Sequence, residues 1–441
     1  MKRIYEPSAY SNHLIGHCFW MDGAPLAQHP LLVGEQSADV AIIGAGFTGL
    51  SAALHLARDC VDVAVVDAEQ PSWGATGRNG GFCCLGGSLL SDVQIKRRVG
   101  DEGLIAYRHT EVAAVQHASN LISDLDLDVD RHSAGETQLA HKPKKFAQMQ
   151  TEVAHIHNVY GVRPEILGPH DLAVQGFGTV FHGGPTTPIG FGLNPRKLAQ
   201  GIERAAVLKG ARFFGNSPVI KMNQKGVWHL TTPQGTLIAK RVLIATNGYS
   251  SEDIPTWMRA RYLPVQSSIL VTRPMTTAEL EAANWTTRQA SYDSRLLLHY
   301  FRLLPDNRFL FGMRGGLYAT RRNEARIKHK IRQDFERMFP AWQTVETPHY
   351  WSGLVAFSGS GAPFVGPIPE QENLWAGFGY HGNGVAMANY SGALLADLMQ
   401  GKTPKYPYPD LIKRPPKKFP FGCLRRNLLL PTYLVAETLD L

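Results

Sequence analysis

Residues 39–67 read DVAIIGAGFTGLSAALHLARDCVDVAVVD, and this stretch decides the fold. A β-branched run at 39–43 is followed by a glycine turn at 44–49, a segment with helical spacing at 50–59 and a second β-branched run at 61–66. The stretch therefore predicts a strand, turn, helix and strand in sequence. Such a unit is typical of a Rossmann-like α/β domain.

The turn of this unit carries the motif GxGxxG, formed by Gly44, Gly46 and Gly49. Gly44 permits the tight turn, Gly46 lets the backbone approach a pyrophosphate, and Gly49 allows the helix to pack closely on the strand. Asp67 ends the second strand, where a carboxylate would hold the hydroxyls of an adenosine ribose. The pattern predicts a dinucleotide site for NAD or FAD, and a fortuitous glycine-rich turn is the alternative.

The segment that follows distinguishes the two cofactors. Residues 73–81 read WGATGRNGG, which is similar to the GA[ST]GRNGG segment of flavin amine oxidases in the D-amino-acid oxidase superfamily, most closely the γ-glutamylputrescine oxidase branch. In that family the segment runs beneath the flavin. The resemblance implies an FAD cofactor contacted by Ala75, Thr76, Arg78, Asn79 and Gly80. A solvated loop with one surface arginine is the alternative.

The resemblance covers residues 30–400 and implies two further cofactor contacts in the middle of the chain. Val219 would contact adenine through its backbone. The turn from Ala245 to Gly248, within the sequence ATNGY, would lie at the edge of the cofactor. Without the resemblance, this turn could be any connection from a strand to a loop.

A last cofactor segment lies at residues 375–387, which read WAGFGYHGNGVAM and lead into an apolar helix that ends at residue 399. In the superfamily this helix points its N-terminus at the pyrimidine edge of the flavin, where negative charge develops on reduction. The resemblance therefore implies N–H donors at Gly382, Asn383, Gly384 and Val385. His381 is expected either near the flavin ring or as a hydrogen-bonded residue of the turn.

Two departures from the family pattern bear on the flavin and the substrate. Residues 353–366 read GLVAFSGSGAPFVG and lack the acidic residue that many relatives place before the proline. They also lack the cysteine that carries the thioether-linked flavin of monomeric sarcosine oxidase. We therefore expect noncovalent FAD, and the pattern does not select one substrate.

The nucleotide segments, at residues 36–96, 185–250 and 351–401, are separated by two insertions, at residues 97–184 and 251–350. Within the insertions we predict helices at 102–125, 144–160 and 321–338 and strands at 136–139, 295–304 and 308–313. The expected fold class is α/β, or α+β overall. A Rossmann-like FAD-binding domain would be assembled from the three discontinuous segments, and a mixed-sheet substrate-binding domain from the two insertions.

The predicted strand at 295–304 carries the first candidates for substrate binding. Strict alternation places Tyr300 and Arg302 on one face of this strand. Arginine binds carboxylates through paired hydrogen bonds, and the resemblance to glycine and D-amino-acid oxidases implies that Arg302 and Tyr300 grip a substrate carboxylate. Arg314 and Trp351 are further candidates at the pocket rim. An edge-strand arginine in water is the alternative for Arg302.

Composition and charge bound the remaining possibilities. The 441 residues include 45 Lys and Arg against 37 Asp and Glu, a net charge of +8 that would favour acidic metabolites, nucleic acid or anionic lipid. The basic residues form no recognised nucleic-acid-binding module, so we expect no nucleic-acid partner. The five cysteines lack the pairs and Cys/His clusters of zinc sites, which predicts a reduced cytoplasmic protein without a metal.

The two ends of the chain differ from the rest. Residues 1–35 form an N-terminal extension without the apolar region of a secretory signal, and the glycines in the apolar window 40–57 argue against a membrane span there. Residues 402–441 form a basic and apolar tail. Such a tail could contact an anionic membrane peripherally or a partner subunit, and packing onto its own domain is the alternative.

These observations predict an FAD-dependent amine or amino-acid oxidase. It would take hydride from a carbon that bears an amine, leave an imine and reduce O2 to hydrogen peroxide. A γ-glutamyl-polyamine and an N-substituted amino acid are both candidate substrates. Two alternatives remain open: a membrane-associated flavin dehydrogenase that passes electrons to quinone, and a noncatalytic flavin-binding or tRNA-modifying protein.

Overall fold

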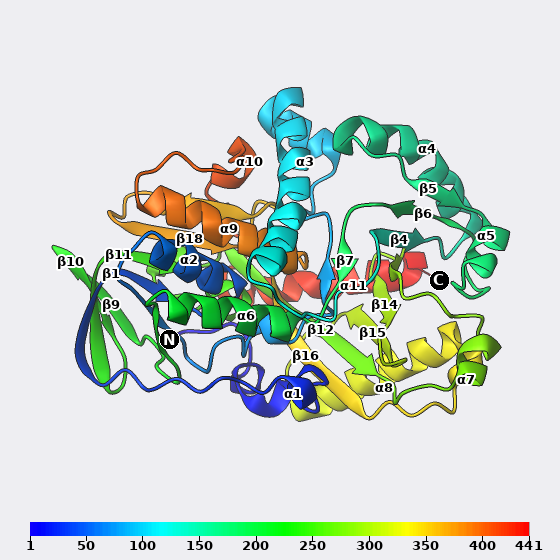
Figure 1. The fold of residues 1–441 in the computed structure, drawn as a ribbon, viewed down its shortest axis with the longest axis horizontal. Helices are drawn as coiled ribbons and strands as arrows, with labels where there is room; N and C mark the ends of the chain where they lie inside the picture. Colours follow the sequence, from blue (N-terminus) through cyan, green and yellow to red (C-terminus); the bar gives the residue numbers. More distant parts are fainter. Residues whose placement is uncertain (441) are drawn as a thin grey trace.

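The computed structural model describes residues 1–440, and its first eight-stranded sheet forms around residues 39–67 (Figure 1). Its central strand, β1 (Gly34–Ile43), pairs in parallel with β11 (Gly235–Ile244) on one side and β2 (Val63–Val66) on the other. The sheet continues with β8 (Arg212–Phe214), β18 (Leu374–Phe378) and β17 (Phe364–Pro367), and β11 also pairs with a hairpin of β9 (Lys221–Lys225) and β10 (Val227–Thr231). The predicted Rossmann-like unit is present.

Both faces of this sheet are covered, which explains why its central strands are almost continuously apolar. Helices α2 (Phe47–Arg58), α6 (Pro195–Leu208) and α9 (Gly384–Met399) lie side by side over one face, as Figure 1 shows. The long helix α3 (Asp92–Asp124) packs against α9. Buried side chains of β1 alternate between the two faces, with Val40 and Ile42 toward the helices and Ala41 and Ile43 toward the opposite core.

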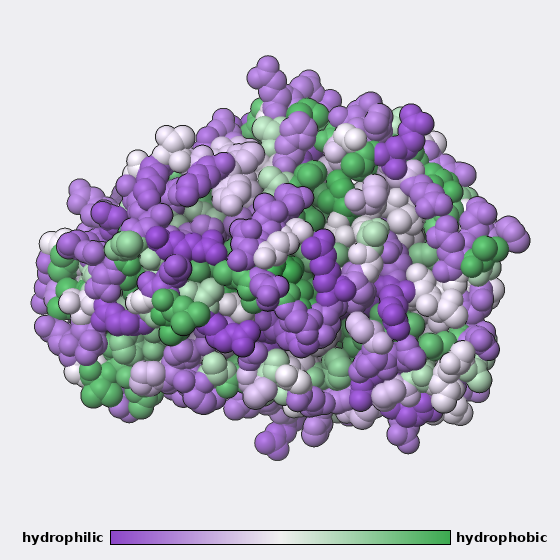
Figure 2. Space-filling model, in the orientation of Figure 1, coloured by the Kyte–Doolittle hydropathy of each residue, from purple (hydrophilic) through white to green (hydrophobic). Residues whose placement is uncertain are grey.

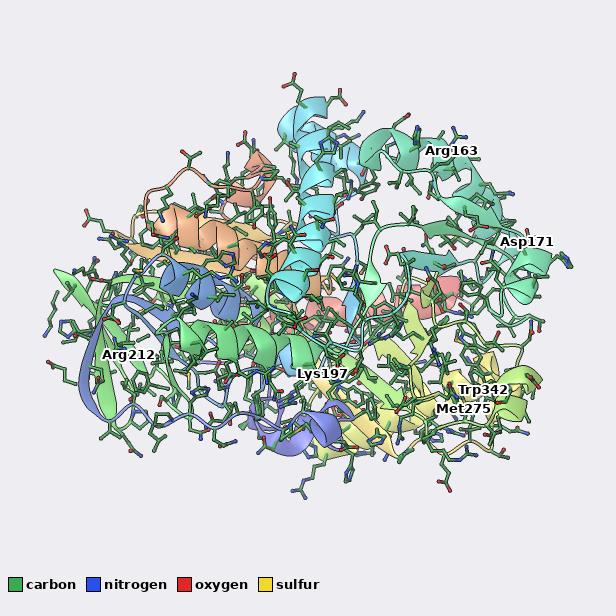
Figure 3. All side chains as sticks on the ribbon, viewed as in Figure 1. Arg163, Asp171, Lys197, Arg212, Met275 and Trp342 are labelled. Atoms are coloured by element: carbon green, nitrogen blue, oxygen red, sulfur yellow. The ribbon has the colours of Figure 1, made fainter. Side chains whose placement is uncertain are left out.

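The second eight-stranded sheet is mixed. Its strands, in spatial order, are β16 (His349–Ser358), β12 (Tyr262–Val271), β15 (Phe309–Arg314), β14 (His299–Leu303), β13 (Ala290–Asp293), β4 (Glu136–Leu139), β6 (Gly184–Thr187) and β5 (Glu165–Leu167). Helices α4 (Pro143–Tyr160), α5 (Pro169–Val174), α7 (Thr277–Ala282) and α8 (Arg321–Met338) surround it. An aromatic core that includes Trp285, Phe309 and Trp342 packs under α8, and Figure 3 labels Trp342 beside Met275 of the same core.

Two boundaries between the sheets differ from the sequence-based expectation. Strand β16 pairs with β12 over its whole length, so residues 351–358 belong to the second sheet and not to the nucleotide segment. Strand β6 likewise pairs with β4 and β5. The partners of both strands lie far away along the chain, and strand propensity does not encode such long-range pairing. The assignment of the other domain segments stays a prediction.

Local element boundaries follow the sequence more closely. Helix α8 and strand β4 have the predicted bounds, and α9 ends at the predicted residue. Strand β14 begins only at His299, because residues 294–295 form a bend and residues 296–297 a turn. Helix α3 begins at Asp92 instead of residue 102, and a positive φ of 76° at Gly100 interrupts it.

The two terminal segments pack against the body of the protein. Trp20 of the N-terminal extension donates a hydrogen bond to the carbonyl oxygen of Asn79. In the tail, the fully buried Arg425 forms two hydrogen bonds with Glu252, at 3.0 and 2.6 Å. Helix α11 (Leu429–Asp440) follows, with Leu429 in an apolar cluster with Leu263. The described part of the tail therefore packs onto its own chain.

One face of the molecule is mostly polar. Figure 2 shows one face covered by hydrophilic residues with apolar residues in scattered groups. The tail leaves Phe421, Leu424 and Leu434 exposed, so its contact with a membrane or a subunit stays a prediction. Within residues 1–440, no helix combines the length and apolar character needed to cross a membrane.

Candidate nucleotide and substrate site

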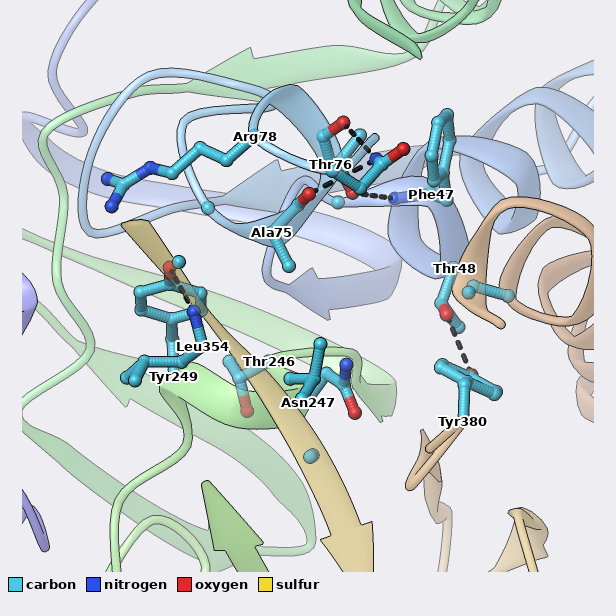
Figure 4. A pocket seen from close by; sticks show the side chains of 18 of the residues that line it. Phe47, Thr48, Ala75, Thr76, Arg78, Thr246, Asn247, Tyr249, Leu354 and Tyr380 are labelled. Atoms are coloured by element: carbon cyan, nitrogen blue, oxygen red, sulfur yellow. Dashed lines mark hydrogen bonds between the residues drawn. The ribbon is translucent and has the colours of Figure 1, made fainter. Parts of the chain in front are cut away.

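A cavity of about 380 Å³ lies where the carboxyl ends of β1, β2 and β11 face the second sheet. Ligands of open α/β sheets bind at this edge of the parallel strands. One side of the cavity is lined by residues of the glycine turn, the 73–80 loop and the start of α9, and Figure 4 shows part of this side. The other side is lined by Cys84, Glu136, Tyr292, Tyr300 and Arg314.

The glycines of the GxGxxG turn form a cradle that a side chain would fill. Gly44 has a φ of 106°, and a Cβ atom there would lie 2.8 Å from the carbonyl oxygen of Ala245. A Cβ atom at Gly49 would overlap the carbonyl oxygen of Gly44, so helix and strand touch there as predicted. Gly46 lines the cavity, and a Cβ atom on it would approach the Thr76 hydroxyl to 3.0 Å. The cradle fits the close approach of a pyrophosphate.

Asp67 lies at the end of β2 and lines the same cavity. Its two carboxylate oxygens accept hydrogen bonds from the N–H groups of Ala45, at 2.6 Å, and Glu69, at 2.9 Å. Burial raises the pKa of Asp67 to about 6, although these two N–H groups lower it. Each oxygen keeps a free lone pair for a ribose hydroxyl. Arg3 of the N-terminal extension also lines the cavity and interacts favourably with this carboxylate.

The 73–80 loop is held by its own side chains. Asn79 donates to the carbonyl oxygens of Ala75 and Thr76 and accepts a hydrogen bond from the N–H of Gly81 at 2.8 Å. The Thr76 hydroxyl accepts a hydrogen bond from the N–H of Phe47 at 2.9 Å, drawn in Figure 4. These bonds join the loop to the first turn of α2. Ala75, Thr76, Asn79 and Gly80 all line the cavity.

Arg78 is a buried cation at the cavity wall. Its guanidinium stacks on the Trp73 ring at 3.9 Å, and Nε donates to the carbonyl oxygen of Trp73 at 2.8 Å. Nη1 donates to the carbonyl oxygen of Ser352 at 3.3 Å. Nη2 is buried and has no partner among the described residues. A buried, unsatisfied donor is costly, so this atom fits a cofactor oxygen better than it fits an empty wall.

Helix α9 directs its N-terminus at the cavity. Gly382, Asn383, Gly384 and Val385 line the cavity, and Asn383 provides no side-chain cap because its amide donates to the carbonyl oxygen of Leu85. The first N–H groups of an α-helix have no intrahelical acceptor. The N–H of Asn383 does not fit the expected donor set, because it already donates to the carbonyl oxygen of Tyr380 at 2.9 Å. The N–H groups of Gly384 and Val385, with the partial positive charge of the helix end, fit the anionic edge of a reduced flavin.

His381 lines the cavity, but both of its ring nitrogens are already used. Nε2 accepts a hydrogen bond from the N–H of Ser358 at 3.1 Å, and Nδ1 donates to the carbonyl oxygen of Gly87 at 2.8 Å. Burial lowers the pKa of His381 to about 4. The ring is therefore neutral and fixed in one tautomer, which agrees with the hydrogen-bonded alternative. The geometry does not support His381 as a catalytic residue.

Arg302 does not line the cavity, which corrects the expectation that it forms the clamp with Tyr300. It is 1% exposed, and its guanidinium donates to Nε2 of His132 and to the carbonyl oxygen of Leu193, both at 2.6 Å. The backbone at Gly81 and Gly192 covers it so closely that a Cβ atom at either glycine would overlap the guanidinium. Burial lowers its pKa to about 9.

Of the residues predicted to bind the substrate, Tyr300 and Arg314 line the cavity, on the side formed by the second sheet. Tyr300 shares a hydrogen bond of 2.9 Å with the Ser267 hydroxyl, and burial raises its pKa to about 12. Arg314 ends β15, and its one hydrogen bond, to the carbonyl oxygen of His381, is 3.4 Å long. No carboxylate of the described residues pairs with Arg314, and burial lowers its pKa. Arg314 is thus a cation free to bind a ligand anion.

Three other predicted residues have different positions. Val219 lines the cavity, and its backbone contact with adenine stays a prediction. Gly248 does not line it, because a Cβ atom there would meet the carbonyl oxygen of Leu354 at 2.9 Å, and its neighbours Asn247 and Tyr249 line it instead. Trp351 also lies outside the cavity wall. It is buried and donates to the carbonyl oxygen of Arg78 at 2.7 Å, so it supports the 73–80 loop.

Sequence reasoning missed several cavity residues. Glu136 begins a strand that was predicted, but a single glutamate at a strand end carries no signal of a site. Tyr292 lies on β13, opposite residues of β4 and β14. Cys84 also lines the cavity, and the sequence pattern gave no sign of this. Burial raises the pKa of its thiol well above the ordinary value, which disfavours the reactive thiolate. Among the described residues, no group of three His, Cys, Asp or Glu side chains could hold a metal ion.

The sheet order, the glycine cradle and the uncapped helix end define a dinucleotide-binding α/β protein in which a second, mixed sheet closes the cofactor site. Comparison with known proteins agrees with this class. Residues 39–398 match the family model described as DAO, FAD dependent oxidoreductase. The chain belongs to the DAO family of FAD-dependent oxidoreductases.

Individual relatives cover most of the chain. The probable oxidoreductase OrdL of Rhizobium meliloti (strain 1021) is 31% identical over 410 residues, which are 91% of each chain. The γ-glutamylputrescine oxidoreductase of Escherichia coli (strain K12) is 26% identical over 84% of this chain and 88% of its own. The crystal structure of glycine oxidase from Geobacillus kaustophilus has a TM-score of 0.68 at 19% identity, over 84% of this chain and 96% of its own, and shows that the fold is shared.

Proposed function

We propose that this protein oxidises the carbon–nitrogen bond of an amine that also carries a carboxylate, with noncovalent FAD as cofactor and O2 as electron acceptor. The observation that carries the proposal is the position of Arg314. Its guanidinium has no anionic partner among the side chains that the structure describes, which exclude those of residues 437, 439 and 441, and it lines the same cavity as Tyr300 and the uncapped N-terminus of α9. An arginine in such a place suits two-pronged binding of a carboxylate.

The cofactor side supplies the redox chemistry. Bound FAD would supply the two-electron chemistry, an acceptor for a hydride from the carbon that bears the amine; the substrate would become an imine that water hydrolyses, and O2 would take the electrons to give hydrogen peroxide. The residues suited to holding it are those of the glycine cradle, Asp67, the 73–80 loop and the start of α9. Burial keeps the Cys84 thiol protonated beside the cavity, which supports noncovalent attachment.

The residues of the second sheet that line the cavity would bind and orient the substrate. Arg314 would hold the substrate carboxylate, and the Tyr300 hydroxyl, which shares a hydrogen bond with Ser267, would form the polar wall beside it. Leu298 and Tyr292 add apolar surface to the wall. Such surroundings favour the neutral form of a substrate amine, which is the form that yields hydride. The names of relatives point to two substrate classes, a γ-glutamyl polyamine and a small amino acid.

Anaerobic bleaching of the bound flavin tests the proposal. Purified protein is mixed with amino acids, N-methyl amino acids, γ-glutamylputrescine and simple amines that lack a carboxylate. We expect bleaching by at least one carboxylate-bearing amine, followed by oxygen consumption and peroxide release in air. Bleached flavin that persists in air but is reoxidised by a quinone would identify a dehydrogenase instead. Failure of every amine to bleach the flavin would favour the noncatalytic alternative.

A further inference from the structure

Glu136 is a buried carboxyl group on the substrate side of the cavity. It is the first residue of β4 and pairs with Ala290 of β13 and Thr187 of β6, in the interior of the second sheet. Its side chain is 8% exposed and lines the main cavity. The adenosine, pyrophosphate and flavin contacts described above do not use it.

The carboxyl group of Glu136 has no cationic partner. No Lys, Arg or His among the described residues forms an ion pair with it, and no backbone N–H donates to it. The Cys84 thiol interacts with it favourably, and the buried Glu111 unfavourably. Glu111 itself is already paired, with Arg108 at 2.8 Å and with the Tyr160 hydroxyl at 2.7 Å. A buried carboxylate that contacts a thiol but no cation among the described residues is costly, so this position calls for a cationic ligand.

A second cavity of about 190 Å³ begins at the same residue. Glu136, Leu85 and Tyr292 line both cavities, so the second cavity continues the first one at this wall. Leu85, Ile156 and Pro185 give it apolar walls that suit a methylene chain, while Gln138 and Thr187 offer hydrogen-bond acceptors. The chemistry of this side cavity fits an extended chain with a cationic end.

The charges of Glu136 and Arg314 complement each other across one cavity. Both groups interact electrostatically with Cys84, yet they form no ion pair with each other. Each is therefore free for an external partner of opposite charge. A ligand with one ammonium and one carboxylate would satisfy both.

We propose that Glu136 binds a positively charged group of the substrate that is distinct from the amine that is oxidised. This inference rests on the proposed function and narrows its substrate class to carboxylate-bearing amines with a second, unreacted ammonium group. The carboxylate of Glu136 accepts the ammonium N–H donors, and charged hydrogen bonds of this kind are the strong ones. A role for Glu136 as the base for the reacting amine is the competing reading, and the experiment separates the two.

Matched acyl-putrescines provide the test. γ-Glutamylputrescine and glutarylputrescine have the same reacting aminobutyl group and the same carboxylate, but only the first has the second ammonium. Steady-state kinetics of both are measured on the FAD-loaded parent, Glu136→Gln and Glu136→Asp. Glu165→Gln, an exposed glutamate of the same sheet, is the control. D- and L-ornithine against D- and L-norvaline form a second matched set.

We expect the parent to favour the ammonium-bearing member by about tenfold or more in KM, with similar kcat. In Glu136→Gln the ratio of the two KM values falls to about one. Glu136→Asp restores part of the preference, and Glu165→Gln keeps it. Flavin content and Tm of Glu136→Gln stay at the parent level, because a neutral amide replaces an unpaired buried acid. A loss that is equal for both members of a pair, or no change in the preference, would overturn the proposal.

The pH profile gives an independent readout. Burial raises the pKa of Glu136 to about 8, with Glu111 adding to the rise and Cys84 opposing it; Tyr292 and Tyr160, which also face it, stay neutral because burial raises their own pKa values. Ionised Glu136 binds the ammonium, so the preference should grow as the pH rises from 6.5 to 8.5. Glu136→Gln should show a flat ratio. The reacting amine titrates in both probes and cancels from the ratio.

Failure of the proposed function would be visible separately. If no probe bleaches the flavin of the parent, the proposed oxidation is wrong, and binding of the same pairs is then followed by the absorbance change of oxidised flavin. If the parent binds the ammonium-bearing member of a pair tenfold more tightly, and Glu136→Gln removes this difference, the inference is still supported. Equal affinity within every pair, or no binding by any probe, would overturn it.

Discussion

Replacing Arg314 with lysine is expected to weaken substrate binding without lowering the stability of the protein. The same change at Arg302 is expected to lower the stability without weakening substrate binding. The two arginines lie on neighbouring strands, β15 and β14, and both are largely surrounded by protein. Their partners differ. Arg314 faces the cavity with one long hydrogen bond of 3.4 Å, and Arg302 is held by two of 2.6 Å.

The hydrogen bonds determine the expected magnitudes. Lysine keeps the charge but loses the forked geometry, so Arg314→Lys gives up about one charged hydrogen bond to the substrate, worth roughly 1.5–3 kcal/mol. This corresponds to a rise in KM of about 10- to 150-fold. At Arg302 the lost charged hydrogen bond is one within the folded protein, so Arg302→Lys should lower the free energy of unfolding by about 1.5–3 kcal/mol.

The assay combines kinetics with the best carboxylate-bearing amine, flavin content and thermal unfolding of both variants. Arg314→Lys should keep the flavin and the Tm of the parent, and Arg302→Lys should keep its KM while its Tm falls by several degrees. The reasoning is refuted if Arg314→Lys turns over the substrate with the KM of the parent while Arg302→Lys raises it. A best substrate without a carboxylate would also remove the basis for the clamp.

Three further variants, two of them with a matched control variant, test other parts of the structure. Gly46→Val should lose bound FAD, because a Cβ atom already approaches the neighbouring threonine hydroxyl to 3.0 Å; Gly23→Ala, in open space, should retain it, and acid precipitation should release the flavin of the parent. Both ring nitrogens of the buried His117 lack partners, and burial lowers its pKa to about 3, so the unfolded chain binds its proton first and stability falls as the pH drops from about 6.5 toward 3. His117→Phe should raise the Tm at pH 7 and make its decline toward pH 5 shallower; an unchanged slope would contradict this. Arg425→Met leaves a buried carboxylate unpaired and should cost about 3–5 kcal/mol in denaturant unfolding, whereas Arg426→Met, which breaks a partly exposed pair, should cost about 1 kcal/mol or less.

The sequence by itself determined the nucleotide half of the protein. The strand, turn and helix around Gly44 follow from short-range rules: β-branched runs, helical spacing and glycines where a Cβ atom would meet backbone. The helix that ends at Met399 and the free N–H groups at its start follow from the same local logic. Asp67 lies in the cavity because the carboxyl end of a central parallel strand always faces this edge of the sheet.

Only the tertiary structure decided which charged groups line the cavity. Alternation along β14 places Tyr300 and Arg302 on one face, but it does not show that the backbone of Gly81, Gly192 and Leu193 closes over Arg302. Leu193 lies 109 positions away along the chain. Glu136 likewise lines the cavity only because β4 joins β13 and β6 in the interior of a sheet. Periodicity specifies the direction in which a side chain points, whereas burial and pairing depend on segments that only folding brings next to it.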